Sequence, residues 1–297
     1  MNKAIFVLAL AGALLVQDGA EAASLKAELV MPGGRSWKGH VVGRDGDWVE
    51  FATANSAKPI RVGASTIQEL NFEIDLDAEE VMEMKRNREF ERVIGALERA
   101  MKPFLDYSDI PSNLTKYNAL LMEINYQIGN FDKAMAIASK ISEDGRDPVM
   151  QEKSRIFQAL ALIDAGRTAE AEELLSKYGW DKGVSDDSPP EKLYITAKLL
   201  ALKKEYSKAM ELVAKVIAFN SQNTEWMQPA ELLCAELYME LGATNPLMYD
   251  SAEEVVREIS LLYKNTVEYD KAQLLKVKIQ ELRAVQEVEK SLESEEA

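Results

Sequence analysis

The spacing of hydrophobic residues changes once along the chain, near residue 75. Before that point hydrophobic and polar residues alternate, as in residues 25–31, and short Gly-containing turns separate the runs. A period of two is typical of strands that bury one face. From Leu76 onward the period becomes that of a helix. The pattern therefore predicts an α+β, mostly α protein, in which a β module of residues 23–75 precedes a long helical region.

Five short strands are expected within the β module. Pro32-Gly33-Gly34 and Asp45-Gly46 supply turns, because Gly tolerates positive φ angles. Five strands of this length bury enough surface only by curling into a small closed barrel. The stretch from Pro32 to Val42 resembles the turn and bent second strand of SH3-like and Sm-like barrels. We therefore predict a five-stranded barrel over residues 23–75.

The resemblance to Sm-like barrels does not imply RNA binding. Residues 45–48 and 62–65 do not match the base-binding loops of that family. Residues 24–74 carry six basic and six acidic side chains, so this module has no electrostatic attraction for phosphate. No nucleic-acid partner is expected.

Trp37 and Trp48 permit two interpretations. They would form an aromatic peptide-binding patch, as in SH3 domains that dock proline-rich ligands, or one or both would fill the barrel core or pack on the helices. We favour the second interpretation. Trp48 is out of phase with Val49 and Phe51, so it is expected to be the more exposed of the two, and His40 is expected on the surface of a strand.

Ten helices are expected beyond residue 75, because Pro and Gly punctuate the chain at short intervals and the segments between them have helical periodicity. The predicted helices are 77–101, 112–128, 131–143, 149–164, 168–178, 190–203, 206–219, 227–241, 248–263 and 266–292.

A repeat of 37–38 residues runs through the helical region. A turn followed by a helix with Ala at its fourth position occurs at Ala134, Ala171 and Ala209. A second series of Ala lies twelve residues earlier in the chain. Small residues at fixed offsets mark places where two helices approach closely. The second series comprises Ala159, Ala197 and, continuing it, Ala235.

These positions resemble the tetratricopeptide repeat (TPR). Ala159, Gly166 and Ala171 match one unit, Ala197, Tyr206 and Ala209 the next, and Phe131 and Ala134 the unit before. Met122 and Thr168 depart from the pattern. The resemblance implies TPR-like helical repeats over residues 76–265, a capping helix over 266–292 and a disordered acidic tail at 293–297. The apolar residues of 266–292 would alternatively seed a coiled coil.

The resemblance also implies a concave surface lined by the first helix of each pair, which would bind a peptide or protein partner. Its apolar members Ile156, Leu160 and Ile163 fit a core equally well. The surface would contain Lys116, Ala119, Glu123, Tyr126, Lys153, Ile156, Leu160, Ile163, Glu191, Tyr194 and Lys198.

The first residues are typical of an export signal. A positive start at Lys3 precedes thirteen uncharged, mostly apolar residues, 4–16, and then Ala20-Glu21-Ala22. The apolar run is too short for a spanning helix, which needs about 20 residues. We predict a signal peptide of residues 1–22, cleaved near Ala22, and a periplasmic or secreted protein with no membrane span in the mature chain.

The net charge and the scarcity of His and Cys exclude several kinds of site. The 297 residues carry a net charge of −15, and removal of residues 1–22, with one Lys and two acidic residues, would leave −14. Because residues 24–74 are neutral, this charge lies in the helical region and favours a basic partner. A single His, His40, and a single Cys, Cys234, exclude an intrachain disulfide, a Cys/His zinc site and a His-based triad. No cofactor is expected.

Three functions are consistent with these observations. The first is an exported, non-enzymatic interaction scaffold of the cell envelope. The second is an envelope hydrolase that uses carboxylates on helices, since two carboxylates need no local motif. The third is a self-assembling structural protein that uses its C-terminal helix.

Overall fold

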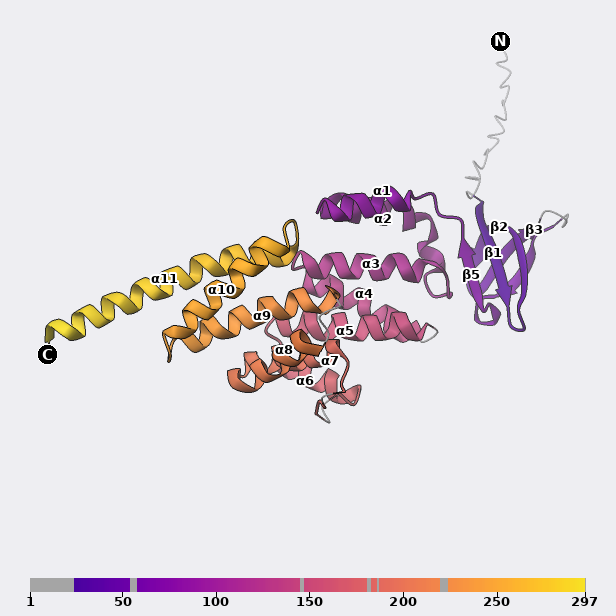
Figure 1. Ribbon diagram of the computed structural model, residues 1–297. Coiled ribbons are helices and arrows are strands. Elements are labelled where there is room, and N and C mark those ends of the chain that lie inside the picture. Colours follow the sequence, from indigo (N-terminus) through magenta and orange to yellow (C-terminus); the bar gives the residue numbers. More distant parts are fainter. Residues whose placement is uncertain are drawn as a thin grey trace, which may run out of the picture. The chain divides into compact units, whose positions relative to one another are not determined.

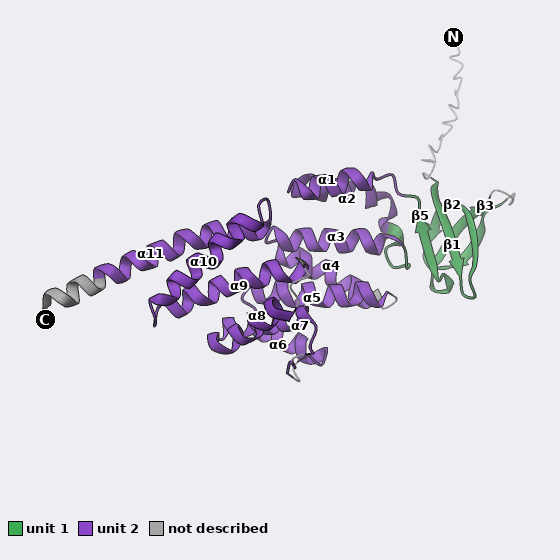
Figure 2. Ribbon diagram, viewed as in Figure 1, with its two compact units in different colours: residues 1–73, 106–112 green, residues 74–105, 113–297 purple. Residues whose placement is uncertain are grey.

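The computed structural model describes residues 24–53, 58–144, 147–180, 183–185, 187–219 and 224–296, without the side chains of 144, 224 and 289–296. The signal peptide predicted for residues 1–22 lies outside this part of the chain and stays a prediction. The chain forms two compact units, drawn in different colours in Figure 2. One contains the residues up to 73 together with 106–112, and the other contains 74–105 and the residues from 113 onward.

The first unit is a five-stranded antiparallel sheet with the order β4-β3-β2-β1-β5. Its buried face carries residues that alternate along the strands, among them Leu29, Val41 and Phe51. The strands are β1 (Leu25–Met31), β2 (Arg35–Asp45), β3 (Trp48–Thr53), β4 (Ile60–Gly63) and β5 (Glu69–Phe72).

The five strands confirm the predicted number. The prediction that they close into a barrel is wrong. Within the described residues, β4 and β5 are the two ends of the sheet and do not pair with each other. The backbone N–H of Leu70 on β5 donates instead to the carbonyl of Pro111, at 2.8 Å. Arg44 on β2 donates to the carboxylate of Asp109, with Nη2–Oδ2 at 2.7 Å, and the rings of Phe72 and Tyr107 lie 5.7 Å apart. Residues 106–112 therefore occupy the edge that closure would need.

The second unit is helical, which confirms the mostly α fold (Figure 1). Nine of the ten predicted helices appear as single helices. The prediction of one helix over 77–101 is wrong, because the chain breaks at 87–89, where Arg88 has φ +62°. The helices are α1 (Ala78–Arg86), α2 (Phe90–Met101), α3 (Leu114–Gln127), α4 (Phe131–Asp144), α5 (Pro148–Asp164), α6 (Thr168–Lys177), α7 (Pro190–Leu202), α8 (Tyr206–Phe219), α9 (Thr224–Gly242), α10 (Leu247–Leu262) and α11 (Val267–Glu296).

Five helices among the described residues end with the same backbone geometry. In each, one cap residue follows the helix, the next residue has positive φ, and the N–H after it donates to the carbonyl five residues earlier, as in a Schellman cap. Two of the five left-handed residues are not glycine, so the sequence does not mark those turns with a glycine. The left-handed residues are Arg88, Gly129, Gly166, Gly179 and Lys204.

The predicted small-residue contacts are all buried. Each Ala of the two series is at most 1% exposed, so the backbones of neighbouring helices approach closely there. Met122, at the equivalent position of α3, is also fully buried and fills this space with a larger side chain. The unit therefore consists of layers of helix pairs, consistent with a helical repeat region. The buried Ala are Ala134, Ala171, Ala209, Ala159, Ala197 and Ala235.

The last helix, α11, packs against α9 and α10 through the buried Ala272, Leu275 and Ile279. Arg88, in the turn after α1, forms an ion pair with Asp270 near the start of α11. The first and last helix pairs of this unit are therefore in contact. The tail at 293–297 was expected to be disordered, but the helical backbone continues to Glu296.

Candidate functional site

A hollow of about 700 Å³ lies where α5, α7 and α9 end and α11 passes them. Its wall combines aliphatic side chains with three carboxylates and four lysines. We call it the α11 hollow. Its lining includes Ile163, Asp164, Lys198, Leu202, Lys204, Leu233, Glu236, Glu240, Lys271, Leu274 and Lys278.

Asp164, at the end of α5, is held from two sides. The hydroxyl of Tyr126 on α3 donates to its Oδ2 at 2.6 Å, and Lys198 on α7 forms an ion pair with its Oδ1. The side chains of Lys198 and Asp164 are only 15% and 19% exposed. Removing one partner of an ion pair shielded to this degree is costly, because the other charge would remain largely out of water without its counter-charge. Asp164 is therefore fixed in place by its neighbours.

Glu236, one layer further along on α9, has different surroundings. It is half-buried and lines the hollow, and it forms no hydrogen bond or ion pair with any other described residue. Burial raises its pKa above the ordinary value, and the nearby charges of Lys198 and Lys271 oppose this only in part. Glu236 is thus a partly desolvated acceptor that faces an open space.

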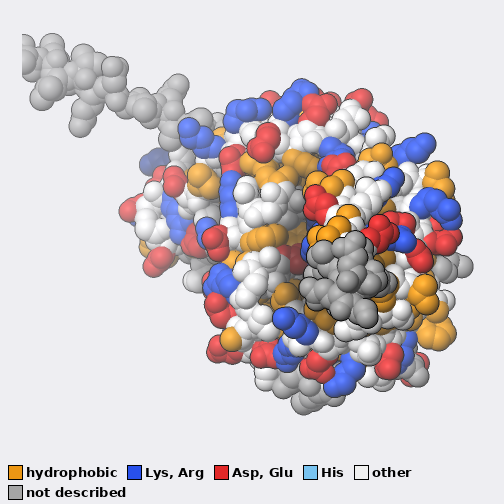
Figure 3. Space-filling view, turned by 90° about the vertical axis from the view of Figure 1, so that its left-hand side faces the viewer, with side chains coloured by type: hydrophobic (Ala, Val, Ile, Leu, Met, Phe, Trp, Pro, Cys, Tyr) orange, Lys and Arg blue, Asp and Glu red, His pale blue; other side chains and the backbone are white. Residues whose placement is uncertain are grey.

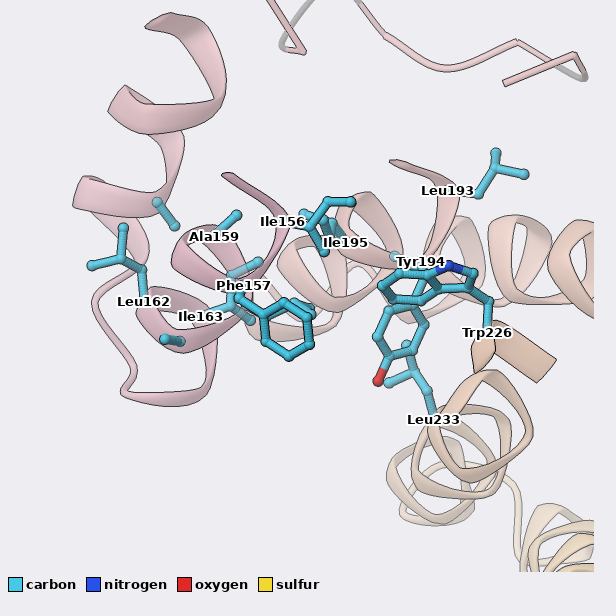
Figure 4. Packing of buried hydrophobic residues seen from close by; sticks show 14 of the residues in the cluster. Ile156, Phe157, Ala159, Leu162, Ile163, Leu193, Tyr194, Ile195, Trp226 and Leu233 are labelled. Atoms are coloured by element: carbon cyan, nitrogen blue, oxygen red, sulfur yellow. The ribbon is translucent and has the colours of Figure 1, made fainter. Parts of the chain in front are cut away.

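Tyr194 and Trp226 are core residues that pack against each other, with ring centroids 5.7 Å apart (Figure 4). The ammonium group of Lys198 lies 5.7 Å from the Tyr194 centroid. Burial raises the pKa of Tyr194 well above its ordinary value, so its hydroxyl stays protonated at neutral pH. The buried Tyr194 ring restricts where the Lys198 side chain can move.

A second polar cluster lies among the first helices. Glu123 on α3 bonds to Lys85 on α1 and to Lys153 on α5, the latter at 2.9 Å. Burial alone would raise the pKa of Glu123, but the charges of the two lysines lower it below the ordinary value. Because these groups satisfy one another, they are not available to a partner.

The structure places the predicted concave residues in four different environments. Lys116 is exposed, and Glu191 is half-buried. Glu123, Tyr126 and Lys153 belong to the polar contacts described above, whereas Ile163 and Lys198 line the α11 hollow. The remaining residues are core side chains at most 8% exposed, so a partner cannot reach them; these are Ala119, Leu160 and, labelled in Figure 4, Ile156 and Tyr194.

The sequence interpretation missed Asp164, Glu236 and Lys271. A signal existed, because Asp164, Lys198, Glu236 and Lys271 follow one another at intervals of 34, 38 and 35 residues and alternate in sign. These intervals are close to the repeat length. Charges that recur at the repeat length on successive layers are expected to meet.

The tryptophans do not form one patch. Trp37 is 40% exposed and Trp48 is 49% exposed, so neither fills a core, contrary to the interpretation we favoured. Trp48 is the more exposed, as its phase predicted. Trp37 lies near the start of β2, whereas Trp48 pairs with Asp45 at the end of the same strand, and Arg61 lies over its ring at 5.7 Å. His40 is exposed on β2, as expected.

The described residues contain no group of three or more His, Cys, Asp or Glu arranged to hold a metal ion. No helix among them is both long and apolar enough to cross a bilayer. The sequence matches no protein-family model and no curated protein.

Proposed function

We propose that the protein is an exported, non-enzymatic interaction scaffold whose TPR-like helical layers bind a peptide or protein segment in the α11 hollow. One observation carries this proposal: Glu236 is a partly desolvated carboxylate without a hydrogen-bond donor, and it lies in a hollow with an apolar rim. A half-buried carboxylate keeps only part of its hydration, so a ligand that brings a donor and displaces the remaining water would gain free energy there.

The rim indicates what else the partner must carry. Leu202 is 44% exposed and Leu274 is 73% exposed on opposite sides of the hollow. Exposed leucines beside an unpaired polar group resemble the anchor positions of peptide-binding sites. The partner segment would therefore have an aliphatic side chain next to a donor, either a backbone N–H or a basic side chain.

Long-range electrostatics favours a basic partner. The helical region carries nearly all of the net negative charge, which would attract a positively charged partner before contact. Within the hollow, however, Lys198, Lys204, Lys271 and Lys278 offset the carboxylates. Charge would therefore speed the encounter, whereas the apolar contact and the bond to Glu236 would hold the complex together.

The test is affinity capture from envelope extract with residues 23–297 as bait, followed by binding of the captured protein in purified form. Glu236→Ala and Leu274→Lys should each weaken binding at least tenfold. Leu247→Lys is the matched control, because Leu247 is 68% exposed on α10 and does not line the hollow. A partner that binds all three variants as well as the wild type would show that the hollow is not the binding site.

The second candidate, a carboxylate hydrolase, has one observation in its favour. Glu236 has a raised pKa, as a general acid requires, and Asp164 is near enough to contribute to that rise. Asp164, however, is engaged by Lys198 and Tyr126. Hydrolysis of envelope glycans or peptides by the wild type that is lost in Glu236→Gln would favour the hydrolase, whereas partner binding that survives Glu236→Gln without any turnover would favour the scaffold.

A further inference from the structure

The two ends of the helical unit are joined by one ion pair. Arg88 lies in the turn after α1, Asp270 lies in the first turn of α11, and the guanidinium group of Arg88 donates to the carboxylate of Asp270 across 182 positions of the sequence. In Figure 1 the start of α11 accordingly lies beside the turn between α1 and α2. Helix pairs stacked in a row contact only their neighbours, so the ends of such a row normally stay apart. Here the row closes on itself.

Arg88 adopts a strained backbone conformation at this contact. Its φ of +62° belongs to the left-handed region, which is costly for a residue with a Cβ. The Nε atom of Arg88 is buried and has no hydrogen-bond partner among the described residues. Glycine would form the same turn without strain, so the turn itself does not require arginine. The guanidinium group is needed instead for the bond to Asp270.

The end-to-end contact is polar, whereas the rest of α11 packs through apolar side chains. Ala272, Leu275 and Ile279 are buried against α9 and α10. Within the described part of the chain, no other hydrogen bond or ion pair joins residues 78–101 to α11. The side chains of Arg88 and Asp270 are 30% and 51% exposed, so water can solvate both groups when their bond breaks. The contact can therefore open while the core beneath α11 stays packed.

The start of α11 faces both the first layer and the middle of the row. The pKa of Arg88 is raised chiefly by its hydrogen bond to Asp270, against the effect of burial, and the charge of Glu268 adds to the rise. Burial raises the pKa of Tyr194 on α7, and Glu268 adds to that rise as well. Glu268 therefore lies near both groups. When the ends are joined, the start of α11 closes over the side of the layers on which Tyr194 lies.

Broad electrostatic attraction does not account for the closure. On the face shown in Figure 3, Lys and Arg side chains are interspersed with Asp and Glu, and hydrophobic side chains lie between them. Extended patches of opposite charge would attract each other over a long range, but interspersed charges largely cancel beyond a Debye length of about 8–10 Å. The local pair of Arg88 and Asp270 is thus the attraction that holds the first layer to the last.

We propose that the pair of Arg88 and Asp270 is a latch that switches the helical unit between a closed ring and an open row. A small rotation at each layer, added over the whole row, separates the two ends. The closed ring predominates at low ionic strength, and salt favours the open row because it screens a partly exposed pair. Opening uncovers the side of the layers over which the start of α11 lies. The latch is separate from the partner site proposed for the α11 hollow.

The test is the distance between two spin labels, measured by double electron–electron resonance on residues 23–297. The labels are attached to Glu83→Cys and Lys264→Cys in a Cys234→Ala background, because positions 83 and 264 are exposed, one on α1 and one just before α11. The chain with an intact latch should give one narrow distribution of distances at about 50 mM salt and a longer, broader one at about 1 M salt. Arg88→Glu should give the longer, broader distribution at both concentrations, and Arg88→Glu/Asp270→Arg should restore the narrow one.

Arg257→Glu is the matched control. Arg257 pairs with Glu254 within α10, so this change removes an exposed ion pair without touching the latch and should leave the distances unchanged. Glu236→Ala and Leu274→Lys should also leave them unchanged, so opening of the latch and loss of partner binding can be told apart.

Equal distances in Arg88→Glu and in the chain with an intact latch at low salt would overturn the proposal. A broad distribution that the exchanged pair Arg88→Glu/Asp270→Arg fails to narrow would overturn it also. Circular dichroism checks that the helix content is unchanged. If Arg88→Glu loses helix, Asp270→Asn takes its place with the same expected distances, because it alters a side chain that is 51% exposed.

Discussion

Replacing Lys198 by Met tests whether the helical layers depend on their internal ion pairs. The substitution keeps the length of the side chain and removes its charge. Asp164 then retains the hydrogen bond from Tyr126 but loses its only cationic partner among the described residues. The carboxylate would remain largely shielded from water, since its side chain is 19% exposed.

The magnitude follows from that exposure. A fully exposed pair contributes about 0–1 kcal/mol, whereas removing one partner of a fully buried pair costs about 3–5 kcal/mol. At 15% and 19% exposure, Lys198 and Asp164 lie nearer the buried limit, so Lys198→Met should cost about 2–3 kcal/mol. For a domain of this size that corresponds to a fall in Tm of about 5–10 °C. The double variant Lys198→Met/Asp164→Asn should recover more than half of this loss, because no unpaired charge remains.

The assay is urea and thermal unfolding followed by circular dichroism, with Lys203→Met as the matched control. Lys203 pairs with Glu172, but these side chains are 39% and 44% exposed, so its loss should cost less than about 1 kcal/mol. If Lys198→Met costs no more than Lys203→Met, the Asp164 pair is effectively solvated and the reasoning is refuted.

The pH dependence provides a second readout of the same variant. Lys198 is the strongest of the charges that oppose the rise in the Glu236 pKa, so its loss should raise that pKa further. A carboxyl group with a pKa raised by folding destabilises the native state when ionised and ceases to do so when protonated. The stability difference between wild type and Lys198→Met should therefore shrink as the pH falls through the raised pKa, and an increase in that difference would contradict this account.

Three further outcomes are expected. Gly39→Ala should destabilise the sheet unit by about 2 kcal/mol or more, because the new Cβ would lie 2.1 Å from the backbone oxygen of Ala52; hydrogen exchange of residues 24–53 measures this, and unchanged protection would contradict it. Lys204 has φ +62°, which glycine adopts without strain, so Lys204→Gly should raise the free energy of unfolding by about 0.5–1 kcal/mol and raise the Tm. A lower Tm would mean that the contacts of the Lys204 side chain outweigh the relief of backbone strain. Burial raises the pKa of Cys234 to about 11, so at pH 8 only about one thiol in a thousand should be ionised; an aromatic disulfide reagent should react quickly only in denaturant, and fast reaction of the native protein would disprove this.

Local periodicity was sufficient to predict most elements of the fold. Strand alternation and helical spacing depend on neighbours in the sequence, and the Ala series marked the helix contacts correctly because a close approach excludes larger side chains. The break at Arg88 within the predicted helix 77–101 was not foreseen, since neither Gly nor Pro marks it and the left-handed conformation falls on a charged residue.

Features that depend on distant segments could not be predicted in this way. The open sheet results from residues 106–112, which lie beyond two helices in the sequence yet bond to β5 and β2. The tetratricopeptide resemblance placed the binding surface along the first helix of each pair, but four of its residues, Ala119, Ile156, Leu160 and Tyr194, are core residues. Asp164 and Glu236 line the α11 hollow because the ends of α5, α7 and α9 converge on α11. No single segment of the sequence specifies that convergence.

The alternating charges of successive layers have a consequence for how such a protein can change in length. Asp164, Lys198, Glu236 and Lys271 stand one layer apart, with signs that alternate from each layer to the next. Deletion of the pair α7 and α8 would bring Asp164 against Glu236 and unite two acids in a shielded place, whereas deletion of two consecutive pairs would preserve the alternation. Shorter or longer descendants of this chain should therefore differ from it by an even number of helix pairs.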